Sequence, residues 1–236
     1  MNWSAAVAEV ILALDLPGGT EALRLLDRLS GVRWVKVGSI IMTREGPVFI
    51  RTLIERGLHV FLDLKWHDIP STVAGAVAAA RDFGVGMATL HTLGGLAMME
   101  AAATAAGDTL SLVGVTVLTS HDAKSYSQAL GRGTVNVAEE VKRQARTATA
   151  AGLAGVVCSP SEVSLVRSVL GEGGRIVVPG IRRGSDARDD QARVASAKDA
   201  VGDGATHLVV GRPVLQAADP AVVFQEFLEE ARCAAS

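Results

Sequence analysis

The chain has 236 residues and a formal net charge of −2, and no segment concentrates Lys and Arg as a nucleic-acid-binding surface would. Hydrophobic residues make up 49% of it and aromatic residues 4%, so Ala, Val, Leu and Ile must form the core, yet no apolar run reaches the roughly 18 residues that span a bilayer. Residues 1–10 contain no basic segment and the only cysteines are Cys158 and Cys233, which predicts a reduced cytoplasmic protein without a signal peptide or a disulfide framework.

Short apolar runs alternate with longer amphipathic segments from one end of the chain to the other. The expected strands are residues 10–14, 34–37, 59–64, 87–90, 112–117, 156–158, 176–178 and 207–210. The expected helices are residues 20–30, 47–56, 71–83, 96–106, 135–151, 161–170, 191–201 and 222–234. Strands that are apolar on both faces indicate a parallel sheet covered by helices. Eight such units in a row favour an α/β fold closed into a single (β/α)8 TIM barrel.

Loops and linkers indicate how the chain is organised. No Pro- or Ser-rich linker divides it, so we interpret residues 1–236 as one barrel domain. Two polar segments are long, 119–134 after the fifth strand and 180–190 after the seventh, and long loops in compact domains are often functional.

Polar residues gather where the strands end, which is where a β/α barrel carries its catalytic groups. The residues at or just after these ends are Asp15, Lys36, Asp63, Lys65, His91, Thr119, Cys158, Arg182 and Arg212. A barrel without a site would have no need for so many charged side chains at one end, so we expect a functional site there.

The sharpest local signal is the spacing Asp63-x-Lys65-x-x-Asp68. Residues 63 and 65 lie two apart on a strand and therefore point to the same side. An inward-facing charged pair is costly unless it is paired, and Lys36 on the adjacent strand can pair with Asp63. The alternatives are a structural ion pair between Asp63 and Lys65 and a helix cap at Asp68. The position at the end of the barrel favours chemistry.

A phosphate site is the second signal. Barrels often bind phosphate with the loops after strands seven and eight. Here these loops contain Arg182, Gln191, Gly211 and Arg212, and glycine N–H groups and the arginine fork both suit an anion. Each residue alone could be an ordinary surface arginine or turn glycine, but the two loops together favour phosphate.

Other polar residues carry weaker signals. We interpret His67 and His91 as structural and Cys158 as a small buried residue, and we place His207, at the start of a strand, at the opposite end from the site. No H-E-x-x-H, cysteine cluster or G-x-G-x-x-G occurs, so no metal site and no cofactor are expected.

The run FLDLKWHDIPSTV at residues 61–73 closely resembles the signature of the bacterial orotidine 5′-phosphate decarboxylase family. The resemblance spans nearly the whole chain. It includes the segments 12–15 (LALD), 35–38 (VKVG), 115–120 (VTVLTS), 178–182 (VPGIR), 190–191 (DQ), 210–213 (VGRP) and 216–220 (QAADP). The chain departs from the family pattern at Ser71, Ser39-Ile40 and residues 183–185, none of which is expected to perform chemistry.

The resemblance implies an enzyme that decarboxylates orotidine 5′-monophosphate to uridine 5′-monophosphate, the last step of de novo pyrimidine nucleotide synthesis. It implies electrostatic catalysis without a metal or organic cofactor, in which Lys36, Asp63, Lys65 and Asp68 form a charged set and Lys65 donates the proton. Asp15 and Lys36 would bind ribose hydroxyls, Thr119 the pyrimidine ring, and Arg182, Gln191, Gly211 and Arg212 the phosphate. Asp68 and Thr72 would come from the neighbouring subunit of a homodimer.

Two other functions remain open from the sequence. Metal-dependent 3-keto-L-gulonate 6-phosphate decarboxylases and hexulose-phosphate synthases carry a similar Asp-x-Lys-x-x-Asp strand, although residues 67–70 and 179–191 favour the orotidine family. A catalytically inactive nucleotide-binding barrel would be expected to lack a member of the charged set, yet Lys36, Asp63, Lys65 and Asp68 are all present.

Overall fold

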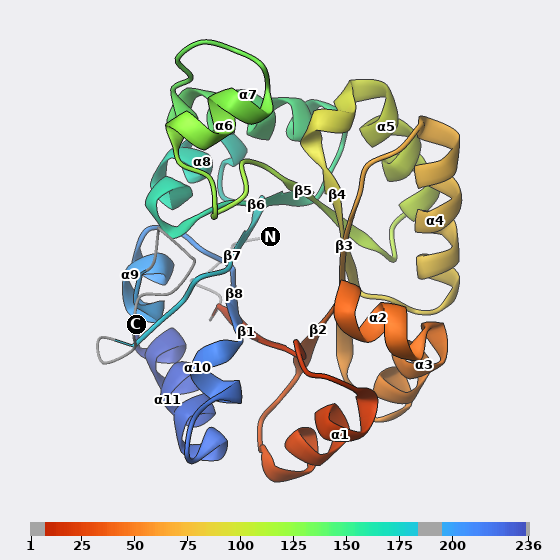
Figure 1. The fold of residues 1–236 in the computed structure, drawn as a ribbon, viewed down its shortest axis with the longest axis vertical. Helices are drawn as coiled ribbons and strands as arrows, with labels where there is room; N and C mark the ends of the chain where they lie inside the picture. Colours follow the sequence, from red (N-terminus) through yellow and green to blue (C-terminus); the bar gives the residue numbers. More distant parts are fainter. Residues whose placement is uncertain (1–7, 184–194, 235–236) are drawn as a thin grey trace.

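The computed structural model describes residues 8–183 and 195–234. Its eight strands are parallel and pair in chain order, and the eighth closes the barrel against the first. Figure 1 looks along this barrel, with the strands around the centre and the helices outside them. The expected (β/α)8 TIM barrel is confirmed.

The strands lie close to their expected positions. They are β1 (Glu9–Ala13), β2 (Trp34–Gly38), β3 (His59–Trp66), β4 (Met87–His91), β5 (Ser111–Val115), β6 (Gly155–Val157), β7 (Arg175–Val178) and β8 (His207–Val210). The largest difference in length is at β3, which continues to Trp66 and so carries Lys65 within the strand.

Helices at the predicted positions also follow in the predicted order: α1 (Gly19–Arg28), α3 (Pro47–Glu55), α4 (Pro70–Asp82), α5 (Gly95–Ala106), α7 (Val137–Ala150), α8 (Val163–Leu170), α9 (Ala197–Gly202) and α11 (Pro220–Cys233). The expected helix 191–201 is described only from residue 195, so its first residues lie outside the described part. None of the helices in the described ranges is long and apolar enough to span a membrane.

Short helical segments that the sequence did not predict follow several strand ends. They are α2 (Ser39–Glu45), α6 (Ala123–Ala129), α10 (Arg212–Leu215) and the 3-10 turns η1 (Thr92–Gly94) and η2 (Pro160–Glu162). The interpretation of 119–134 as a loop is therefore corrected. Asp122 accepts a hydrogen bond from the N–H of Ser125, and the Ser125 hydroxyl accepts one from the N–H of Asp122, which caps α6. Such short helices have no long hydrophobic period to reveal them.

Side chains alternate between the inside of the barrel and the layer under the helices. Ile11, Ala13, Trp34, Phe61, Met87, Val113, Val177 and Val209 form the inner cluster. The residues between them, such as Val10, Leu12, Val35 and Leu62, belong to the larger cluster that packs against the helices. Asp63 lies two residues after the inward-facing Phe61 on β3, so the alternation of the strand directs its carboxylate inward as well.

Aromatic and imidazole rings close the amino-terminal end of the barrel. Trp34 stacks on His59 with ring centroids 4.9 Å apart and meets the buried His207 edge-on at 5.9 Å. Burial and the nearby Arg175 guanidinium lower the pKa of His207 to about 3, so this ring is neutral at physiological pH. As predicted, His207 lies at the end of β8 away from the strands' carboxyl ends.

Candidate active site

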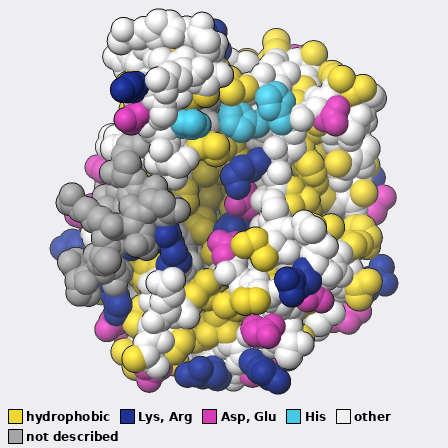
Figure 2. Space-filling model, viewed as in Figure 1, with side chains coloured by type: hydrophobic (Ala, Val, Ile, Leu, Met, Phe, Trp, Pro, Cys, Tyr) yellow, Lys and Arg dark blue, Asp and Glu magenta, His cyan; other side chains and the backbone are white. Residues whose placement is uncertain are grey.

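The carboxyl ends of the strands open onto a cavity of about 670 Å³, a volume typical of small-molecule sites. Its floor is apolar and consists of Ala13, Phe61, Val115, Val157, Val177 and Val209. Charged side chains stand above this floor, and Figure 2 shows acidic and basic groups together in the hollow at the centre of this face. A ligand with one apolar face and several polar groups would fit these surroundings.

Four charged residues on or just after three adjacent strands form a chain of alternating sign along one wall. The Lys36 ammonium lies 3.0 Å from Oδ1 of Asp15 and 3.5 Å from Oδ2 of Asp63. The Lys65 ammonium lies 2.9 Å from Oδ1 of Asp63. The pairing of Asp63 with Lys36 and Lys65 that the sequence predicted is therefore present, and the chain of four sums to zero charge.

Asp63 is the centre of this chain. Its side chain is only 13% exposed, and burial works against ionisation. The Lys36 and Lys65 ammonium groups, with hydrogen bonds from Lys65 and Thr89, outweigh burial and hold the pKa of Asp63 below its usual value. Asp63 is thus a carboxylate at neutral pH, fixed at the base of the cavity. Lys65 is more open, with 40% of its side chain exposed, and it lines the cavity, so its ammonium group is accessible to a ligand there.

The backbone at Lys65 is unusual. Its φ of 52° lies in the left-handed region, and no other non-glycine residue in the described ranges has a positive φ. For an L-residue this conformation costs ~1–2 kcal/mol, and it persists only where its surroundings hold it. The N–H of Lys65 donates to Oγ1 of Thr89 on β4, at 2.9 Å, so part of that support comes from the neighbouring strand.

The candidate phosphate residues lie on the other side of the cavity. Arg182, Gly211 and Arg212 all line it, and Arg182 is buried with its guanidinium donating to the carbonyl of Ile181. Arg212 begins the short helix α10, directly after β8. Gln191, the remaining predicted member, lies outside the described residues. The described residues after β7 and β8 thus line the same cavity, and their phosphate role stays a prediction.

The other predicted residues divide into two groups. Thr119 lines the cavity, after the end of β5. Asp68 and Thr72 are exposed, do not line it, and Asp68 accepts a hydrogen bond from the adjacent N–H of Ile69. The helix cap considered for Asp68 is not present, because Ile69 occupies the N-cap of α4. Within the described part of the single chain, no ion pair joins Asp68 to Lys65.

Several residues of the site were not predicted from the sequence. Ser39, Ile40 and Gln216 line the cavity, and so does Cys158, which the sequence suggested only as a buried residue. Thr89 is fully buried beneath the charged chain. The alternation of side chains along β4 could have identified Thr89, because it lies two residues after the inward-facing Met87. The others follow strand ends in segments without a regular period.

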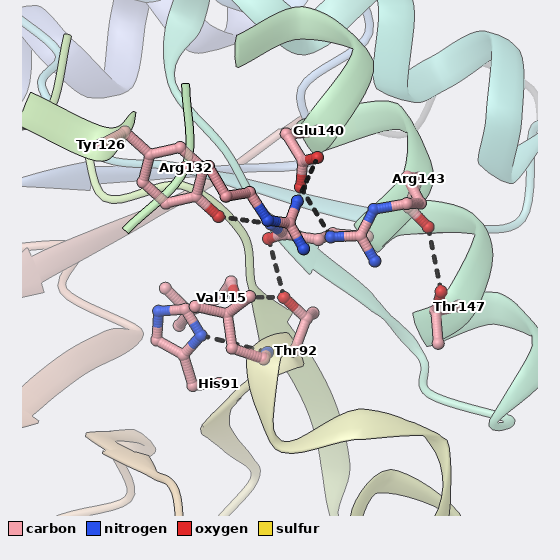
Figure 3. Close-up of polar contacts among 10 residues, drawn as sticks. His91, Thr92, Val115, Tyr126, Arg132, Glu140, Arg143 and Thr147 are labelled. Atoms are coloured by element: carbon pink, nitrogen blue, oxygen red, sulfur yellow. Dashed lines mark hydrogen bonds and ion pairs between the residues drawn. The ribbon is translucent and has the colours of Figure 1, made fainter. Parts of the chain in front are cut away.

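A buried polar network supports the segment after β5, as Figure 3 shows. The Thr92 hydroxyl lies 2.9 Å from the carbonyl of Val115 and 2.8 Å from Oε1 of Gln144. Gln144 in turn donates to the hydroxyl of Tyr126 on α6, at 2.8 Å. Each of these side chains is nearly inaccessible to solvent, so the network fixes α6 against α7. Because Thr119 lies between β5 and α6, the network also fixes the far end of the segment that contains Thr119.

Two histidines lie at the rim next to the charged chain. The rings of His67 and His91 stack with centroids 5.6 Å apart. Burial, with repulsion from His67 and Lys65, lowers the pKa of His91 to about 4. Nδ1 of His91 accepts a hydrogen bond from the N–H of Leu93, which agrees with the structural role expected for it.

Known proteins resemble this chain over nearly its full length. Residues 8–227 match the model of the orotidine 5′-phosphate decarboxylase / HUMPS family. The orotidine 5′-phosphate decarboxylase of Alkalilimnicola ehrlichii is 49% identical over 217 residues, covering 90% of this chain and 92% of that protein. The protein of the same name from Thermosynechococcus vestitus is 43% identical, covering 95% of this chain and 97% of its own. The crystal structure of the Lactobacillus acidophilus orotidine 5′-phosphate decarboxylase aligns with a TM-score of 0.84 at 33% identity, covering 95% of this chain and 99% of that one.

Proposed function

The chain belongs to the orotidine 5′-phosphate decarboxylase / HUMPS family, and from that membership we propose that it converts orotidine 5′-monophosphate to uridine 5′-monophosphate in pyrimidine nucleotide synthesis. The observation that carries this proposal is the ion pair between Lys65 and the buried Asp63 at the base of the cavity. The curated relatives that bear this enzyme's name, at 43% to 49% identity, support the same substrate.

The reaction breaks the bond between C6 of the pyrimidine and its carboxylate. Carbon dioxide leaves, and the electron pair stays on C6, where the ring offers no electron sink. The Lys65 ammonium stabilises this developing negative charge and transfers a proton to C6, giving uridine 5′-monophosphate. The resulting amine takes a proton back from water before the next turnover.

Asp63 has two effects in this scheme. Its carboxylate accepts a hydrogen bond from Lys65 and so directs the ammonium group toward the cavity. It also lies beside the position of the substrate carboxylate and repels that group, an effect relieved when carbon dioxide leaves. Lys36 and Asp15 form a second, neutral pair next to it and present donors and acceptors to the ribose hydroxyls.

The phosphate of the substrate would lie between the loops after β7 and β8. Arg182 and Arg212 supply guanidinium groups there, Gly211 allows close approach of the backbone, and Gln191 is proposed as a further donor. Thr119, across the cavity, would contact the pyrimidine ring. Binding energy from the phosphate, which does not react, would hold the ring over Lys65.

We propose that the reaction needs no metal ion. Lys36, Asp63 and Lys65, with Asp68 supplied by the partner, form a set of two lysines and two aspartates whose charges cancel, so these groups can stay ionised in a dehydrated site. The metal-dependent sugar-phosphate enzymes considered above belong to the same broad family, so a magnesium requirement is the property that separates the two functions. We expect the enzyme to act in the cytoplasm.

The working unit is proposed to be a homodimer in which Asp68 and Thr72 complete the partner's site. Both residues are exposed outside the cavity of their own chain. Large apolar side chains are also exposed on the same rim: Ile69 at 64%, Leu93 at 38% and Leu96 at 44%. Exposed apolar groups beside functional polar residues are typical of a protein interface.

The test is to follow the ultraviolet absorbance of orotidine 5′-monophosphate mixed with the purified protein in excess EDTA. We expect the absorbance to fall with the wild type and to stay constant with Lys65→Ala. No fall with the wild type, together with magnesium-dependent activity on a 3-keto-hexonate 6-phosphate or hexulose phosphate, would replace this proposal with the sugar-phosphate function.

A further inference from the structure

The register between β3 and β4 breaks at the reactive lysine. Leu62 pairs with Ala88 and Trp66 with Leu90, so residues 63–65 of β3 lie opposite Thr89 alone. A strand that gains residues in this way bulges and redirects its side chains. The left-handed backbone of Lys65, with φ of 52°, lies within this bulge. The conformation that sets the direction of the Lys65 side chain therefore depends on what holds the bulge.

One hydroxyl group joins both reactive residues at this point. Oγ1 of Thr89 accepts a hydrogen bond from the main-chain N–H of Lys65, at 2.9 Å. The same hydroxyl donates to Oδ1 of Asp63, at 3.0 Å. The assignment follows from chemistry, since a main-chain N–H only donates and a carboxylate only accepts. Oδ1 of Asp63 also accepts a hydrogen bond from the Lys65 ammonium group.

We propose that Thr89 is a positioning residue for the decarboxylation: its hydroxyl fixes the bulge at Lys65 and the carboxylate of Asp63 in one arrangement, so that the ammonium group faces C6 of the substrate. This inference rests on the function proposed above. Thr89 itself does not line the cavity and is fully buried, so it acts through Lys65 and Asp63 and does not touch the substrate.

Other buried threonines show that this arrangement is particular to Thr89. The Thr116 hydroxyl is equally buried and donates to the main-chain carbonyl of Val157. The Thr92 hydroxyl lies near the carbonyl of Val115 and the amide of Gln144. Among the described residues, neither hydroxyl has a hydrogen bond to a charged residue of the cavity wall. Thr116 is therefore a matched control for the general cost of removing a buried hydroxyl.

The experiment compares Thr89→Val, Thr89→Ser and Thr116→Val in steady-state decarboxylation of orotidine 5′-monophosphate, with thermal unfolding of each variant. We expect Thr89→Val to lower kcat by about 10- to 100-fold while KM changes less than about threefold, because positioning affects the reacting groups and leaves the phosphate contacts intact. Thr89→Ser, which keeps the hydroxyl, should restore kcat to within about threefold of the wild type. Thr116→Val should leave kcat within about twofold.

Two results would overturn the inference: a kcat for Thr89→Val close to that of the wild type, or equal losses in Thr89→Val and Thr89→Ser, which would indicate packing. If Thr89→Val does not fold, Thr89→Cys takes its place, since a thiol keeps the volume and is a weak hydrogen-bonding group. A kcat for Thr89→Cys at least about tenfold below that of Thr89→Ser supports the inference, and equal values contradict it. An inactive wild type would instead refute the proposed function, and with it the role of Thr89.

Discussion

The Lys36 ammonium lies 3.0 Å from Oδ1 of Asp15, and both groups lie next to the position that a side chain on Gly38 would occupy. A Cβ built on Gly38 would be 3.1 Å from Nζ of Lys36 and 3.2 Å from Oδ1 of Asp15. The charged chain therefore requires an empty position at the end of β2 as well as the charges themselves.

We accordingly expect Gly38→Ala to raise KM for orotidine 5′-monophosphate. The backbone of Gly38 is extended, so alanine is allowed there, and the effect comes from pushing Lys36 and Asp15 apart by a few tenths of an ångström. A loss of about 1 kcal/mol would raise KM roughly fivefold. Gly173→Ala is the matched control, because a Cβ at Gly173 meets nothing within 4 Å. Equal kinetics in the two variants would contradict the steric explanation.

Lys65→Ala is expected to abolish turnover and to leave the fold intact. Alanine at φ of 52° is strained as lysine is, so the backbone cost is present in both proteins. Loss of the proton donor and of the positive charge should lower kcat by at least about 1,000-fold. The decarboxylation rate and the thermal unfolding temperature are measured for each variant. Lys124→Ala is the control, because Lys124 is exposed. Near-normal activity of Lys65→Ala would refute the proposed role.

The phosphate assignment predicts a loss that depends on the substrate. Arg212→Ala should lower kcat/KM for orotidine 5′-monophosphate by roughly 10- to 100-fold, the effect of losing one or two hydrogen bonds to a charged group. It should leave the slower reaction of the nucleoside orotidine unchanged, because that substrate has no phosphate. Arg183→Ala is the control, since Arg183 pairs with Glu226 and does not line the cavity. Equal losses with both substrates would place the effect of Arg212 elsewhere.

A mixing experiment tests whether Asp68 works across a subunit interface. Lys65→Ala and Asp68→Asn should each be inactive alone. If Asp68 completes the partner's site, random exchange of subunits in an equal mixture should recover roughly a quarter of wild-type activity, because half of the dimers are mixed and each holds one complete site. If Asp68 served the cavity of its own chain, every site in the mixture would lack one residue, and no activity would return.

Acid should destabilise the fold through His207. Burial and Arg175 lower the pKa of His207 from 6.5 to about 3. The unfolded chain therefore binds this proton first, so stability is complete above pH 6.5 and declines as pH falls from there toward about 3. One proton contributes at most about 1.4 kcal/mol per pH unit.

The corresponding measurement is the free energy of unfolding at about pH 7 and about pH 5. The wild type should lose more stability over this interval than His207→Gln. His59→Gln is the control, because His59 stacks on the same Trp34 ring but is exposed. An equal loss in the wild type and His207→Gln would exclude His207 as the cause.

The sequence by itself determined the barrel, the end at which its site lies and the pairing at the centre of that site. Strand periodicity is local: residues 63 and 65 must share a side because successive side chains alternate, whatever the rest of the chain does. The long helices and strands were predictable for the same reason. The short helices α2, α6 and α10 were not, because hydrogen bonds at their ends and contacts at the barrel rim replace a hydrophobic period.

The tertiary structure alone decided which groups support the reactive pair. Thr89 lies 24 residues from Lys65 and 26 from Asp63 in the chain, and only the shifted register of β3 against β4 brings its hydroxyl to both. The left-handed backbone at Lys65 and the requirement for glycine at Gly38 also arise from contacts between strands. A residue's own sequence neighbourhood sets the direction of its side chain, but closure of the barrel sets its partners.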